Sequence, residues 1–100
     1  MRFRIIPSAY KHGIDAAEIA AVLSNPRLCV SADARLEGAS LVLFIGAPAV
    51  NEPDIEVIAD LAADPAVVFH AMMLRPTQVA KLGIEHYPYH FAPNYARQRR

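Results

Sequence analysis

The chain has 100 residues, of which 54% are hydrophobic and 20% are charged, and this composition is typical of one folded domain rather than a disordered protein. The formal net charge is zero and the longest apolar run, SLVLFIGAPAV, is too short to cross a bilayer, so we expect no membrane partner. The N-terminal apolar stretch is short and broken by a proline, unlike a signal peptide, and the single cysteine, Cys29, offers no disulfide. We therefore expect a cytoplasmic protein.

The charges are distributed unevenly along the chain. Six acidic residues and no basic residue lie between Glu37 and Asp64, whereas five basic residues and one acidic residue lie from Arg75 to the end. We expect the acidic residues to form a solvated edge of the domain, as charged residues on strands usually do. The basic excess near the end leaves room for a local anion-binding site.

The segment IDAAEIAAVLSNP carries the clearest helix signal. Its aliphatic residues recur at helical spacing, and the spacing predicts a helix over residues 15–24. Asp15 is a suitable N-cap, and Glu18, three residues later, completes a capping box. Asn25-Pro26 predicts the end of the helix, because the residue before a proline avoids the helical conformation.

The remaining elements are predicted as strands and one short helix. The predicted strands are RFRII, RLCVSA, SLVLFIG, DIEVIAD and AVVFHAM, with a hairpin-like connection around Gly38 and a short helix in PTQVAKL. SLVLFIG is apolar on both faces and is expected to be a central strand. The order favours an α+β fold, with a three- to four-stranded antiparallel sheet, an N-terminal helix on one face and a short C-terminal helix.

The chain changes character after Gly83. We expect residues 1–83 to form the single domain and residues 84–100 to form an arm rich in aromatic and basic residues. The aromatics of the arm could stack on nucleic acid bases beside its arginines, or they could pack on a sheet or on a neighbouring chain. Packing is favoured, because exposed arms seldom keep so many aromatic residues.

The order of several short motifs resembles that of a known family. The motifs are KHGI, SNP, LFIG, DIEVIA and the run VFHAMMLR that leads into PTQVAKL. In this order and spacing they are similar to the BrnT-like branch of the RelE/ParE toxin superfamily. His70 stands where the family has the first of two arginines, and Arg75 stands at the second.

The resemblance implies a RelE/ParE-like fold and the toxin component of a bacterial type II toxin–antitoxin system. It further implies a metal-independent ribonuclease without a cofactor, whose partners are a cognate antitoxin and an RNA substrate. A small core and the aromatic arm also lead us to expect a homo- or hetero-oligomer.

His70 and Arg75 are the candidate catalytic residues. Histidine can transfer protons near neutral pH, and the planar fork of arginine matches two phosphate oxygens. On a regular strand His70 would share a face with Val68 and Met72, and Arg75 would point the other way. The chain must therefore bend before Pro76 if His70 and Arg75 are to meet.

Lys11, His12 and Lys81 are the candidate substrate-binding residues, since each could line a phosphate-binding groove. Structural roles compete with these assignments. The KHG motif could serve only to shape the start of the helix, His70 could be a hydrogen-bonded residue of the core, and Arg75 could form a structural ion pair.

Three other functions stay open at this stage. A non-catalytic domain of the same fold could act only through a protein partner, and a gyrase-directed toxin would share that fold. A zinc site is the third, because His86 and His90 have a His-x3-His spacing, although Pro88 between them prevents a regular helix. No metal is expected.

Overall fold

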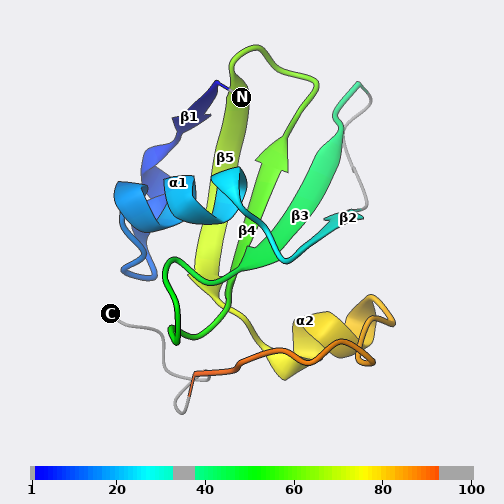
Figure 1. The fold of residues 1–100 in the computed structure, drawn as a ribbon. Coiled ribbons are helices and arrows are strands. Elements are labelled where there is room, and N and C mark those ends of the chain that lie inside the picture. Colours follow the sequence, from blue (N-terminus) through cyan, green and yellow to red (C-terminus); the bar gives the residue numbers. More distant parts are fainter. Residues whose placement is uncertain (1, 33–37, 93–100) are drawn as a thin grey trace.

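Strands and helices follow the apolar segments of the chain in the computed structural model, which describes residues 2–32 and 38–92. The strands are β1 (Phe3–Ile5), β2 (Leu28–Ser31), β3 (Leu41–Gly46), β4 (Ile55–Asp60) and β5 (Ala66–Met73). The helices are the short 3₁₀ helix η1 (Pro7–Tyr10) and the α-helices α1 (Ala16–Ser24) and α2 (Pro76–Lys81). The fold is therefore α+β, as predicted (Figure 1).

The strands form one mixed sheet in the order β1-β5-β4-β3-β2. Four of them are antiparallel, whereas β1 lies at the edge and pairs with the start of β5 in parallel. The prediction of a three- to four-stranded antiparallel sheet is therefore wrong in strand number and in the direction of β1. The long connection from β1 to β5 permits the parallel pairing, which a hairpin could not make.

Helix α1 begins one residue later than predicted, at Ala16, and has the predicted capping box. The Asp15 side chain accepts a hydrogen bond from the backbone N–H of Glu18 at 2.8 Å, and the Glu18 carboxylate accepts one from the backbone N–H of Asp15 at 3.1 Å. Ile19 and Val22 are fully buried against the sheet, and the helix ends at Ser24 with Asn25 as its C-cap, as the Asn25-Pro26 pair predicted. Figure 1 shows α1 crossing one face of the sheet in front of β4 and β5.

The apolar strand β3 lies inside the sheet, between β2 and β4, as its composition predicted. Phe44 belongs to the core under α1, whereas Leu43 and Ile45 belong to a second core on the opposite face. Gly46 ends the strand where an added Cβ would lie 3.3 Å from the backbone at Pro26 and Arg27. The strand therefore needs cover on both sides and a residue without a side chain at its end.

The second face of the sheet is covered by α2 and by the first part of the arm. Val79 of α2 packs with Leu74, and Tyr89 and Phe91 of the arm pack against the same core. Figure 1 shows the arm running alongside α2. The favoured expectation that the aromatics pack is confirmed for these two residues, and they pack on their own chain; residues 93–100, with the arm's arginines, lie outside the described residues.

Two other predictions concern the connection before Gly38 and membrane-spanning helices. Most of the predicted hairpin connection before Gly38 lies outside the described residues. Within residues 2–32 and 38–92, neither α-helix has the length and apolar character needed to cross a membrane.

The capping box of α1 generates the first testable prediction. Replacing Asp15→Ala removes the side-chain acceptor at the N-cap, and we expect the free energy of unfolding to fall by about 1 kcal/mol. Asp15→Asn is the matched control, because asparagine caps helices about as well as aspartate. Urea denaturation of the two variants measures both values, and equal stability of Asp15→Ala and the unmodified protein would contradict a stabilising cap.

Candidate functional site

A buried carboxylate, Glu56, lies at the centre of the candidate site. Its side chain is fully buried on β4 and accepts hydrogen bonds on both oxygens. Oε1 accepts from His70 Nε2 at 2.8 Å and from Arg75 Nη2 at 2.7 Å. Oε2 accepts from Arg75 Nε at 3.3 Å and from the Arg75 backbone N–H at 3.1 Å. Glu56 therefore joins the two residues that the sequence marked as catalytic.

An irregularity in β5 turns His70 toward Glu56. Ile58 pairs with His70, but the next residue of β4, Ala59, pairs with Val68, so Phe69 is an extra residue in β5. Such a β-bulge changes which side chains share a face of the sheet. The prediction that His70 shares a face with Val68 is therefore wrong, since Val68 belongs to the core under α1 and His70 pairs with Ile58 on the opposite face.

Arg75 reaches Glu56 because the chain leaves the sheet just before it. Strand β5 ends at Met73, and Arg75 is the extended N-cap residue of α2, directly before Pro76. The guanidinium offers its Nε and Nη2 edge to Glu56, and this pairing leaves the edge that carries Nη1 for another partner. The Arg75 side chain is 36% exposed, whereas Glu56 has no exposed surface.

The loop after η1 brings a second histidine to the cluster. The ring centroids of His12 and His70 lie 6.3 Å apart, and the rings meet edge to face at 68°. Gly13, with φ 81°, permits the sharp turn that leads from His12 to α1. The structure thus brings His12 together with His70, and Lys11 precedes it as an exposed residue.

Opposing effects act on the charge of Glu56. Burial alone would raise its pKa, but hydrogen bonds from His70 and Arg75 and the positive charge of Arg75 outweigh burial, so the pKa lies below its ordinary value of 4.5. Glu56 is therefore ionised at neutral pH. A buried anion of this kind holds His70 and Arg75 in fixed positions.

The pKa of His12 lies below its ordinary value of 6.5. Partial burial is the main cause, and the positive charges of Lys11, His70 and Arg75 add to it, while the negative charge of Glu56 opposes it. His12 is therefore neutral at pH 7, and a neutral imidazole can accept a proton.

The expectation that the acidic residues form a solvated edge is wrong for Asp54 and Glu56, which are fully buried. Each is paired with an arginine, and Asp54 accepts a hydrogen bond from Arg27 Nε at 3.2 Å. One sequence pattern does indicate the buried position of Glu56, although the uneven charge distribution alone does not. His70 in an apolar strand needs a partner, and the neighbouring strand carries acids at alternate positions.

Lys81 lies apart from the cluster. It is exposed on α2 and lines a separate hollow with Phe69 and Gln78. The contacts within residues 2–32 and 38–92 do not connect Lys81 to His70 or Arg75. Its assignment to the same groove therefore finds no support in the geometry.

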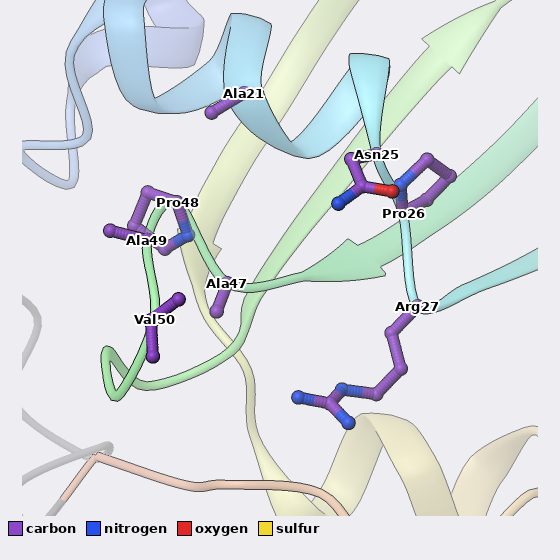
Figure 2. Close-up of a pocket in the computed structure, with 8 residues that line it drawn as sticks. All are labelled: Ala21, Asn25, Pro26, Arg27, Ala47, Pro48, Ala49 and Val50. Carbon is purple, nitrogen blue, oxygen red and sulfur yellow. The ribbon is translucent and has the colours of Figure 1, made fainter.

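A larger hollow lies between the end of α1 and the loop after β3. Figure 2 shows that Ala47, Pro48 and Val50 line it from that loop, with Asn25 on the opposite side. Arg27 also lines it, but its Nε is engaged with Asp54. The lining holds no histidine, acidic residue or nucleophile, so the Glu56 cluster remains the better candidate for chemistry.

No group of three or more histidine, cysteine or acidic side chains that could hold a metal ion occurs in the part of the chain that the structure describes. The side chains of the Glu56 cluster have acid–base and charge-stabilising chemistry of their own. Two imidazoles can transfer protons, and a guanidinium can stabilise negative charge.

Comparison with protein-family models, with curated proteins and with solved structures yields no match to this chain.

Replacing Glu56→Gln should destabilise the fold strongly. The amide nitrogen would face the donors of Arg75, and a positive charge at the sheet would lose its partner. We expect the free energy of unfolding to fall by about 3 kcal/mol, the low end for a broken buried pair, because Arg75 can still reach water. Glu52→Gln, at an exposed acid in the loop before β4, is the matched control for urea denaturation. Equal loss in the two variants would contradict a central role for Glu56.

The lowered pKa of Glu56 also predicts how stability depends on pH. A carboxyl group whose pKa is lower in the folded state contributes stability that is present above its unfolded pKa near 4.5. That contribution is lost as the pH falls through the lower folded pKa. The difference in unfolding free energy between the unmodified protein and Glu56→Gln should therefore be constant near neutral pH and shrink below about pH 4.5. If this difference grew as the pH fell, the pKa of Glu56 would be raised in the folded state, not lowered.

Proposed function

We propose that the protein is a metal-independent endoribonuclease and the toxin of a bacterial type II toxin–antitoxin pair. One observation supports the activity best. A buried Glu56 carboxylate holds His70 and Arg75 side by side, and a second imidazole, that of His12, lies 6.3 Å from His70. Two imidazoles and a guanidinium can supply the proton acceptor, the proton donor and the charge stabilisation that RNA cleavage without a metal requires.

In the proposed reaction the 2′-oxygen of one nucleotide attacks the adjacent phosphorus. The bond from phosphorus to the 5′-oxygen of the next nucleotide breaks, and the products are a 2′,3′-cyclic phosphate and a free 5′-hydroxyl. His12, which is neutral at pH 7, accepts the proton of the 2′-hydroxyl. His70, in its protonated form, donates a proton to the leaving oxygen while Glu56 holds its Nε2.

Arg75 stabilises the charge that develops on the phosphorus oxygens. Its Nε and Nη2 edge is fixed by Glu56, so the edge that carries Nη1 points to a defined place. A guanidinium held in advance needs no reorganisation when the charge appears. Lys11, exposed beside His12, adds positive charge along the path of the RNA backbone.

The toxin role rests on the resemblance in sequence. In this proposal a cognate antitoxin covers the cluster and suppresses cleavage, and the protein acts in the cytoplasm. Expression of the chain alone, with growth and RNA integrity followed together, tests the role in cells. Growth arrest with fragmented RNA, relieved by a small protein encoded next to the gene, is the expected result.

A non-catalytic binding domain is the second candidate, and one observation favours it. His70 and Arg75 both hydrogen-bond to a carboxylate with no exposed surface, which is also how a purely structural polar network is satisfied. In that case the partner protein would bind the surface around the cluster, and no RNA would be cut.

Removal of either imidazole separates the two candidates. We expect His12→Ala and His70→Ala each to lower the rate of RNA cleavage by about 10²- to 10⁴-fold, because each removes one proton-transfer group. The assay uses labelled single-stranded RNA with a chelator present and identifies the cyclic phosphate product.

His90→Ala is the matched control, since it removes an exposed imidazole and keeps the backbone bonds of that residue. Circular dichroism would verify that all variants remain folded. If the folded His12→Ala and His70→Ala variants cleave as fast as the control, the assigned proton transfers are wrong, and absence of cleavage by the unmodified protein would favour the binding domain.

A further inference from the structure

A groove lies between α2 and the arm, and one of the residues that line it, Pro76, directly follows Arg75 of the Glu56 cluster in sequence. Pro76 and Val79 line it from α2, and the arm contributes Glu85, Tyr87, Tyr89 and Phe91. Its volume is about 330 Å³, within the range of sites that hold small ligands. Pro76 and Arg75 both lie at the start of α2, so the groove and the proposed phosphate-binding residue share this part of the chain.

Aromatic rings line the groove in sequence. The ring centroids of Tyr87 and Tyr89 lie 5.5 Å apart, and those of Tyr89 and Phe91 lie 6.0 Å apart. All three side chains are only partly buried, so some of their ring surface remains exposed. Proteins that bind single-stranded nucleic acids commonly stack bases on such a series of partly exposed aromatic rings.

Hydrogen bonds of Tyr89 and of the His90 backbone hold the arm in place. The Tyr89 hydroxyl donates a hydrogen bond to the Ile84 carbonyl at 2.9 Å. Asp54 binds His90 twice, because its backbone N–H donates to the His90 carbonyl and its Oδ2 accepts from the His90 N–H, each at 2.8 Å. The groove is therefore formed before a ligand arrives, which lowers the entropy lost on binding.

Glu85 decides which kind of ligand fits. Its exposed carboxylate would repel a phosphate but can accept hydrogen bonds from the N–H groups of a base. Guanine presents two such donors side by side, N1–H and the N2 amino group, and these match the two oxygens of a carboxylate.

We propose that this groove binds a guanine base of single-stranded RNA next to the phosphate held by Arg75, with Tyr87 as the stacking surface and Glu85 as the acceptor. The inference rests on the proposed ribonuclease function, since it assigns the substrate preference of the same site. A peptide of a partner protein is the competing occupant, and the experiment distinguishes the two.

The cleavage test compares Tyr87→Ala with Tyr87→Phe in the full chain. Alanine removes the stacking surface and should lower kcat/KM by about 10-fold or more on an oligonucleotide that contains one guanine, whereas phenylalanine should restore it. Glu85→Gln should reduce the preference for that oligonucleotide over one with adenine in the same position, and Glu52→Gln should leave the preference unchanged.

A binding test separates failure of this inference from failure of the proposed function. Guanosine, which has no phosphate, is titrated into the protein while the backbone amide resonances are followed. Shifts confined to residues 84–91 and the start of α2, absent with cytidine and lost in Tyr87→Ala, support the groove even if the protein cuts no RNA.

Two outcomes would overturn the inference. Cleavage that depends on His12 but is the same in Tyr87→Ala and Tyr87→Phe would leave the ribonuclease intact and remove guanine binding. If the backbone amide resonances of the groove shifted on addition of a purified partner protein but not of guanosine, the groove would bind protein instead.

Discussion

The burial of a charged carboxylate within the sheet is the constraint on which the rest of the structure depends. An ionised side chain without exposed surface is tolerated only when donors satisfy both of its oxygens. Glu56 obtains those donors from a bulged strand and from the N-cap of a helix. The bulge in β5 and the turn at Arg75 thus both supply hydrogen-bond donors to the buried Glu56 carboxylate.

A second buried acid, Asp54, directly precedes β4 and fixes neighbouring parts of the chain. Asp54 binds Arg27 and the backbone of His90, and its carbonyl accepts the N–H of Leu74 at 3.1 Å. The exit from β5 and the arm are therefore both fixed to the start of β4. Through this short segment the position of the arm is mechanically linked to that of the Glu56 cluster.

Sequence reasoning succeeded where local rules determine the structure. The capping box predicted the start of α1, and the unbroken apolar run predicted an interior strand, because both signals depend on neighbours along the chain. It failed where distant segments decide. The parallel pairing of β1 with β5 and the bulge at Phe69 arise from contacts that no local pattern encodes. The chemistry of His70 and Arg75 marks them as candidate site residues, but the usual exposure of acidic residues on strands predicts a solvated Glu56, and the structure buries it between them.

The parallel pairing of β1 also has a consequence for how the chain folds during synthesis. Phe3 pairs with Ala66, and η1 packs against β5, so the N-terminal segment finds its place only after most of the chain has been made. Contacts between such distant residues slow folding, because a long loop must close before they form. The loop that carries His12 is part of this segment. The two histidines therefore meet only when β5 has left the ribosome, and a nascent chain that is still shorter has no assembled cluster.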